Sequence, residues 1–221
     1  MVEKLLPIER LDVGLGDLVV TAVREAISAG SLAAGQRITE RELVERTGVS
    51  RASVREAVRQ LRQMGLLESP PRGGLRVAPL DRDAIAYIYE VRIGVELLAV
   101  ELFTLRATDQ QIHEWALSLS SADLIPGAGV PEISCGDELL CQGSGNPLLW
   151  HMVQPYHARV RSLQRLSLSL AGRWEKAHAE IAAISTAVRK RDVAGAVRGV
   201  RSHLEEAQRA SLVALVGCSP T

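Results

Sequence analysis

The feature that most constrains this chain is a pair of short helices with almost no sequence between them. Thr39-Glu-Arg-Glu42 has the pattern of a capping box, in which a threonine and the glutamate three residues later satisfy each other's backbone amides. The helix that begins there must be short, because Gly48 favours the left-handed conformation that ends helices. Only Val49 separates this glycine from Ser50, a good N-cap for a second helix. So tight a connection predicts a helix-turn-helix.

The flanking sequence extends this motif. Apolar residues at helical spacing over residues 15–29 predict a preceding helix that ends at Gly30. The second helix of the motif is expected from about 51 to 64. Two short segments of extended pattern, 66–69 and 75–77, then flank a turn rich in proline and glycine, which predicts a β-wing. The N-terminal part is therefore expected to be a winged helix-turn-helix.

The remainder of the chain has a helical pattern from Asp81 onward. Candidate helices cover residues 81–106, 108–121, 135–143, 146–170, 173–190 and 192–215, and a long loop is expected over Ile125–Pro131. We expect a mainly α protein. Its winged domain would occupy residues 1–78, and an all-helical antiparallel bundle with its own core would occupy residues 79–221.

Charge is unevenly distributed, although the net charge is zero. The segment Arg46–Arg76 holds seven arginines against two acidic residues, Glu56 and Glu68. Such a basic segment on a helix-turn-helix predicts contact with nucleic acid. Arg59 and Arg62, far along the second helix, are expected to serve solubility or surface salt bridges instead.

Arg51 and Arg55 lie near the start of that second helix, away from its apolar side. Guanidinium groups can pair with guanine or bind phosphate. Ser50 and Ser53 can contact phosphate beside them, because the amides of a helix N-terminus favour anions. A solvated helix face is the usual interpretation of a charged stripe, but its position on a helix-turn-helix favours DNA binding.

The order of these pieces resembles the GntR family of bacterial regulators. The resemblance spans residues 15–77 and includes Gly30-Ser-Leu-Ala-Ala-Gly-Gln-Arg-Ile38 and Gly48-Val-Ser-Arg-Ala-Ser-Val-Arg-Glu-Ala-Val58. It implies that the residues that touch double-stranded operator DNA are Arg41, Arg51, Arg55, Arg72 and Gly73, with Ser50 and Ser53 beside them.

The second half is similar to the FadR-like branch of that family, whose all-helical effector domain is called FCD. The matching pieces are Tyr89-Glu-Val-Arg-Ile-Gly-Val-Glu96, Ser144-Gly-Asn-Pro-Leu-Leu149, and Asp192 followed eleven residues later by His203-Leu204. The resemblance implies a homodimer that binds a palindromic operator. It also implies that the grip on DNA changes, most simply by release of a repressor, when a small organic acid enters the bundle.

Two interpretations of Arg92 stay open at this point. It is a candidate to hold the carboxylate of the effector, and it lies one turn before Glu96, with which it can form an i, i+4 salt bridge. Because isolated pairs of this kind are common, the spacing does not decide between them.

Many FCD domains hold a divalent ion with one aspartate and three histidines. Alignment on the motifs above places these ligands at Ile133, Asp137, Ile181 and His203. Isoleucine cannot bind a metal, so we predict no metal and no cofactor, and a pocket whose polar groups are Arg92, Asp137 and His203. An alternative is a site displaced by one helical turn, formed by Asp137, Cys141, His178 and His203.

Other functional classes are disfavoured. The sequence contains no Ser/His/Asp arrangement, phosphate-binding glycine loop or paired-carboxylate motif, so we predict a regulator and not an enzyme. The rival hypothesis is an enzyme or scaffold whose helix-turn-helix is only an interaction module. Three cysteines without disulfide or metal spacing predict a cytoplasmic protein, and no apolar stretch has the length of a signal peptide or membrane span.

Overall fold

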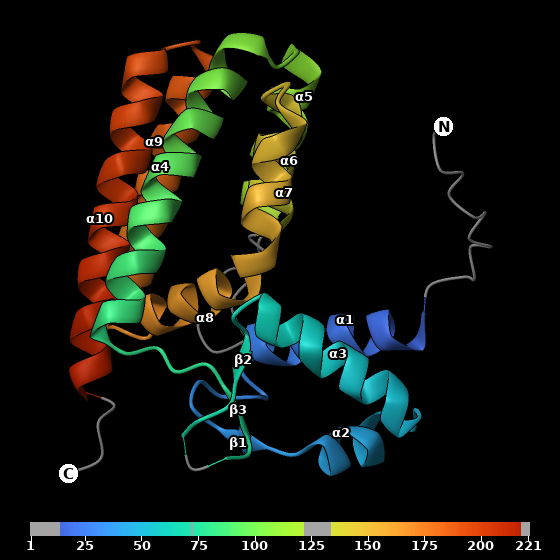
Figure 1. Ribbon diagram of the computed structural model, residues 1–221. Helices are drawn as coiled ribbons and strands as arrows, with labels where there is room; N and C mark the ends of the chain where they lie inside the picture. The colour runs from blue at the N-terminus through green and yellow to red at the C-terminus, as the bar shows by residue number, and fades with distance from the viewer. Residues whose placement is uncertain (1–13, 72, 122–133, 218–221) are drawn as a thin grey trace, which may run out of the picture.

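The computed structural model describes residues 14–71, 73–121 and 134–217 (Figure 1). The elements of its first part are α1 (Leu15–Ala29), β1 (Arg37–Ile38), α2 (Glu40–Thr47), α3 (Arg51–Gln63), β2 (Leu67–Glu68) and β3 (Leu75–Val77). Those of its second part are α4 (Arg82–Arg106), α5 (Asp109–Ser121), α6 (Ser134–Gly143), α7 (Pro147–Val153), the 3-10 turn η1 (Gln154–Tyr156), α8 (His157–Leu168), α9 (Arg173–Arg189) and α10 (Val193–Gly217). The predicted fold class, a winged helix-turn-helix followed by a helical bundle, is confirmed.

The helix-turn-helix forms through the predicted caps. The Thr39 hydroxyl accepts a hydrogen bond from the Glu42 amide at 3.1 Å, and the Glu42 carboxylate accepts one from the Thr39 amide at 2.7 Å. Gly48 ends α2 with a φ of 71°, and the Ser50 hydroxyl accepts from the Ser53 amide at 3.2 Å to start α3. Local sequence alone therefore determines where these two helices begin and end.

The wing belongs to a three-stranded antiparallel sheet with the order β1-β3-β2. The pair β2–β3 is the predicted wing, with Leu67 opposite Val77. Strand β1 lies between α1 and α2, where no strand was predicted. It has two residues, and only its pairing with β3, Arg37 opposite Arg76, gives it extended structure.

Each part has its own apolar core. In the winged part, α1 and α3 pack against each other and the sheet through Val19, Val23, Val54, Leu61, Leu66 and Val77. In the bundle, α4 and α10 run antiparallel along most of their length, with α9 beside them (Figure 1). Their core is filled by Val100, Phe103, Trp115, Ile184, Val188 and Leu204.

The single helix predicted over residues 146–170 is wrong. The chain turns at η1, and α8 leaves α7 in a new direction (Figure 1). Pro155 lies inside this turn; proline lacks an amide proton and its ring clashes with the preceding helical turn, so it interrupts a helix.

The other predicted helices end within two residues of the observed positions. The loop predicted over Ile125–Pro131 lies outside the described residues.

The turn at Pro155 sends α8 against α1. Ala158 of α8 is buried in the core of the winged part. The Ser162 hydroxyl and the Arg165 guanidinium donate to the Ile27 carbonyl, at 3.2 and 3.5 Å, near the C-terminal end of α1. Gly30, which caps α1 with a φ of 78°, leaves the space that the Arg165 guanidinium fills.

Comparison of two glycines tests this contact. A Cβ at Gly48 meets nothing within 4 Å, whereas a Cβ at Gly30 would lie 2.0 Å from Arg165. Both positions are left-handed, so we expect Gly48→Ala to lower the free energy of unfolding by about 1–2 kcal/mol. Gly30→Ala should lower it further, because Arg165 must leave the Ile27 carbonyl. Urea unfolding measures both losses. In an Arg165→Met background the two losses should become equal; equal losses already in the unmodified protein would contradict the role of Arg165.

Candidate nucleic-acid interface and bundle cavity

The first turns of α3 present basic side chains to solvent. Arg51 and Arg55 are exposed, whereas Val54, Ala57 and Val58 on the other side of the helix are buried. Arg55 Nε lies 3.3 Å from Glu40 Oε2, and its side chain keeps 72% of its surface exposed. Exposed ion pairs of this length contribute little to stability, so the guanidinium is available to another anion.

The remaining predicted contacts of the helix-turn-helix lie beside these arginines. Arg41 on the first turn of α2 pairs with Glu45 at 2.8 Å and is 85% exposed. Ser50 and Ser53 are hydrogen-bonded to each other at the N-terminus of α3, with 3.0 Å between their hydroxyl oxygens. The ion pair between Arg55 and Glu40, which precedes Arg41, joins the two helices on this face.

The wing has an exposed glycine turn. Gly73 and Gly74 have φ values of 78° and 90°, which side chains rarely adopt, and the Gly73 amide donates to the Pro70 carbonyl at 2.8 Å. At the base of the wing, Arg76 Nε donates to Glu68 Oε1 across the strands at 2.6 Å. Gly73 is thus exposed in the wing, and its contact with DNA stays a prediction; Arg72 lies outside the described residues.

The distal arginines of α3 differ from the proximal ones. Arg59 pairs with Glu56 at 2.6 Å, which confirms the salt bridge expected for it. The hydrogen bond from Arg59 lowers the pKa of the Glu56 carboxyl. Arg62 is exposed in the last turn of the helix. Arg59 therefore already has an anionic partner within its own helix, one turn away.

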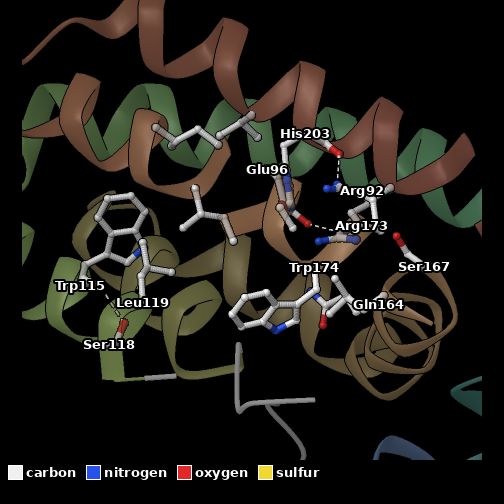
Figure 2. A pocket seen from close by; sticks show the side chains of 16 residues that line it. Arg92, Glu96, Trp115, Ser118, Leu119, Gln164, Ser167, Arg173, Trp174 and His203 are labelled. Carbon is white, nitrogen blue, oxygen red and sulfur yellow. Dashed lines mark hydrogen bonds and ion pairs between the residues drawn. The ribbon is translucent and has the colours of Figure 1, made fainter. Parts of the chain in front are cut away.

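The bundle encloses a cavity of about 110 Å³ between α4, α5, α8, α9 and α10 (Figure 2). Trp115 and Leu119 lie on one side of it in this view, and Arg92, Arg173 and His203 gather on the other. Apolar residues supply most of the remaining wall: Leu168, Trp174, Ala177, Ile181, Ile184, Val200 and Ala207. The cavity therefore combines an apolar side with one cationic corner.

Arg92 has both properties that the sequence analysis considered. Its Nε donates to Glu96 Oε1, one turn along α4, so the i, i+4 salt bridge is confirmed. Its side chain is only 5% exposed, lines the cavity, and stacks over the Tyr89 ring at 5.5 Å. The ion pair fixes the guanidinium at the cavity wall; whether it also binds a ligand stays a prediction.

His203 belongs to a cluster that sequence reasoning missed in part. His203 Nδ1 lies 2.7 Å from Glu180 Oε2, and Arg173 Nη2 donates to the same oxygen at 2.9 Å. Arg173 reaches His203 from the first turn of α9, thirty residues away, and nothing in its local sequence distinguishes it from other arginines. Contact across the bundle alone gives this residue its place in the cavity.

The cluster holds the imidazole neutral. Burial lowers the pKa of His203 most, and the nearby Arg92 and Arg173 lower it further, against the opposing effect of Glu180. The pKa of Glu180 is also lowered: burial raises it, but contacts with His203 and Arg173 outweigh burial. An ionised Glu180 accepts the Nδ1 proton of His203, which leaves Nε2 as a hydrogen-bond acceptor.

Each of the two parts of the chain matches a known family model. Residues 15–77 match the model for bacterial regulatory proteins of the gntR family, and residues 137–206 match the FCD domain. The chain therefore has a DNA-binding domain of the gntR type and an FCD domain. The GntR match contains α1, the helix-turn-helix and the wing, and the FCD match contains the histidine cluster.

Two curated relatives are similar to part of this chain. The HTH-type transcriptional regulator YdhC of Bacillus subtilis is 37% identical over 90 residues, 41% of this chain and 40% of the relative. The Nta operon transcriptional regulator of Aminobacter aminovorans is 38% identical over 78 residues, 35% of this chain and 37% of the relative. Each match therefore covers less than half of the relative's own length.

Solved structures extend the likeness of fold to nearly the whole chain. E. coli McbR/YncC has a TM-score of 0.74 at 20% identity, covering 94% of this chain and all of that one. A putative GntR regulator from Rhodococcus sp. RHA1 has a TM-score of 0.72 at 20% identity, covering 93% of this chain and 99% of that one. Both likenesses concern the fold.

The divalent ion that the FCD resemblance implies does not fit these residues. Ile181, at a ligand position, lines the cavity with a hydrocarbon side chain. His203 is bonded to Glu180 and lies near two guanidinium groups, whose charge repels a cation. Within the part of the chain that the structure describes, no three His, Cys, Asp or Glu side chains converge as a metal site.

The displaced metal site is not assembled either. Cys141 is buried in the core between α4, α5 and α6, and His178 stacks on Trp174 with ring centroids 4.7 Å apart. Neither residue lines the cavity with His203. Asp137 lies in α6, but its side chain is outside the described residues, so its predicted effector contact is a prediction only.

The histidine cluster makes a prediction about pH. Because folding lowers the pKa of both His203 and Glu180, the unfolded chain binds more protons, and stability falls as pH decreases. We expect the free energy of unfolding to begin to fall as pH drops below about 6.5, by at most about 1.4 kcal/mol per pH unit for one group.

His203→Asn removes the titrating group and keeps an N–H donor for Glu180, so the loss of stability just below pH 6.5 should become shallower. His113→Asn, at an exposed position on α5, is the matched control and should retain the original profile. Chemical unfolding at a series of pH values measures both. An unchanged slope in the His203 variant would argue against a buried, neutral imidazole.

Proposed function

We propose that this protein is a DNA-binding transcription regulator whose FCD domain responds to a small organic acid, with repression as the default action in the cytoplasm. The observation that carries the proposal is the exposed arginine face at the start of α3, within a winged helix-turn-helix. In this class of domain the second helix enters the major groove with its N-terminal residues toward the base edges. Arg51 and Arg55 hold those positions here.

The neighbouring residues suit the phosphate backbone. Ser50 and Ser53 lie where the amides of the α3 N-terminus point outward, a favourable place for a phosphate oxygen. Gly73 at the wing tip has no side chain to prevent close approach of the wing backbone to DNA. Arg41 on α2 extends the basic surface beside α3.

The cavity supports sensing more than catalysis. Its cationic groups, Arg92 and Arg173, are guanidinium groups that remain protonated at any pH the protein meets. Such groups bind and orient anions but do not exchange protons with a substrate. A carboxylate ligand fits this chemistry, so we assign the FCD domain to effector binding rather than to an enzymatic step.

A symmetric dimer is supported by an apolar face on α4. Its residues recur at alternating intervals of four and three positions, on the side of the helix away from the bundle core. They are Tyr87, Val91, Gly94, Leu98, Glu101 and Leu105. The four large apolar members are 42–65% exposed. Exposed apolar stripes of this kind mark contacts between proteins.

The position of Gly94 favours a second copy of this chain as the partner. A glycine inside a helix destabilises it by roughly 0.5–1 kcal/mol relative to alanine, and a Cβ at Gly94 would meet nothing within 4 Å. The residue is therefore not required by packing within this chain, but it lies at the middle of α4, where a two-fold axis would bring two copies of the helix closest together. Two winged domains related by that axis would occupy the half-sites of a palindrome.

Alanine variants of the proximal arginines test DNA binding. Arg51→Ala and Arg55→Ala should each weaken binding to promoter DNA upstream of the protein's own gene by about 1–3 kcal/mol, because each removes a base or phosphate contact. Gel-shift titration measures the affinity. Arg62→Ala, exposed at the far end of the same helix, is the control and should bind within experimental error of the unmodified protein. Full affinity in both proximal variants would refute the assignment.

A charge placed on the α4 face tests the dimer. Val91→Asp and Leu98→Asp should each convert the protein to a monomer and weaken operator binding, because two carboxylates would be buried close together across the axis. Light scattering measures the mass. Val216→Asp, at a 75% exposed apolar position of α10 off this face, should remain dimeric. If both α4 variants keep the mass of the unmodified dimer, the interface lies elsewhere.

A further inference from the structure

We propose that Arg173 replaces the divalent ion of related FCD domains, so that the cavity binds a compact monocarboxylate without metal. This inference rests on the proposed function, because it takes the cavity as the effector site. It adds a ligand-binding residue, Arg173, and a ligand class, a single carboxylate on an apolar body of about the size of a benzene ring.

Arg173 has hydrogen-bond donors that the bundle does not use. Its side chain is 6% exposed, and Nη2 contacts Glu180 and the His203 carbonyl. Nε and Nη1 are fully buried and have no partner among the described residues. Unused donors on a buried charge are costly, so they indicate a missing acceptor. A ligand carboxylate in the adjoining cavity supplies that acceptor.

The charges around Arg173 favour an anion over a metal. Glu180 is shared between Arg173 and His203, and the second guanidinium, Arg92, lies near enough to lower the pKa of His203. Among the side chains that the structure describes, a cation at His203 Nε2 would have one imidazole ligand and two positive neighbours. The hydrocarbon side chain of Ile181 supplies no further ligand. The positive charge that a metal would provide is already present in the protein.

The size and lining of the cavity define the rest of the ligand. Its volume of about 110 Å³ is somewhat smaller than an apolar cavity of about 150 Å³ that binds benzene. Trp115 and Leu119 offer an apolar surface away from the arginines (Figure 2), and Ile184 is a further apolar residue of the lining. A ligand with its carboxylate at Arg173 and a flat or branched hydrocarbon body against Trp115 satisfies both sides of the cavity.

Benzoate and benzamide form a matched pair of probes, because they share size and shape and differ in charge. Calorimetric titration uses full-length protein dialysed against a chelator. We expect benzoate to bind, and benzamide to bind at least about tenfold more weakly, as the loss of a charge-assisted hydrogen bond requires. Addition of zinc, nickel or manganese should leave the benzoate affinity unchanged. No binding of benzoate at millimolar concentration, or binding only after metal is added, overturns the inference.

Variants of Arg173 assign the effect to this residue. Arg173→Met keeps the apolar stem and should lower benzoate affinity at least about tenfold without changing benzamide affinity. Arg189 is exposed at the end of the same helix, so Arg189→Met is the control and should change neither the benzoate nor the benzamide affinity. Thermal unfolding checks that Arg173→Met is folded. Should it be unfolded, Arg173→Lys restores a cation and should regain part of the preference for benzoate. Benzoate affinity equal to that of the unmodified protein in a folded Arg173→Met variant overturns the inference.

Gel shifts on the same preparations distinguish failure of the carboxylate site from failure of the proposed DNA-binding function. Unmodified protein that binds DNA but not benzoate contradicts the carboxylate site alone. Unmodified protein that binds benzoate but no promoter DNA contradicts the proposed function and leaves the carboxylate site supported.

Discussion

The contact of α8 with the C-terminal end of α1 joins the two halves of the molecule. The last carbonyls of a helix have no partners within it and carry the negative end of its dipole. Here Ser162 and Arg165 donate to the Ile27 carbonyl, and Gly30 leaves room for the guanidinium. Because Ala158 of the same helix is part of the core of the winged part, α8 belongs physically to both halves.

This position makes α8 a physical route between the cavity and the DNA-binding face. Gln164, Ser167 and Leu168 on α8 line the cavity, while Ala158 and Ser162 contact the winged part. The helix that receives α8 is α1, and α1 packs directly on α3. Coupling between the two sites requires that α8 have two positions that α1 and α3 follow. A ligand can then shift that equilibrium by no more than its difference in affinity for the two positions. α8 owes this position to the turn at Pro155, a single residue that interrupts the helical pattern.

Features determined by neighbouring residues could be predicted, and features determined by distant contacts could not. The capping box at Thr39, the left-handed stop at Gly48 and the Ser50 cap are local, so the helix-turn-helix followed from sequence. Strand β1 exists only through its pairing with β3, and the direction of α8 depends on the surface of α1 that receives it.

The same distinction applies to the cavity. Arg92 and His203 could be proposed from motif positions, whereas Glu180 was not among the predicted site residues. Arg173 stands at the start of α9 with no motif around it, and its role depends on a contact with a residue thirty positions away. Recognition of this arginine required the tertiary structure.

An arginine in place of a metal would give this sensor a different dependence on its surroundings. A site built on a divalent ion requires that ion, and its affinity changes with pH because histidine ligands must lose their protons. A guanidinium keeps its charge at any pH the protein meets. The lowered pKa of His203 also keeps the charge of the site nearly constant, because the imidazole is already neutral where an ordinary histidine would begin to titrate. In the proposed site, occupancy would then depend on the ligand concentration, and the carboxylate affinity would be independent of the supply of metal and nearly independent of pH around neutrality.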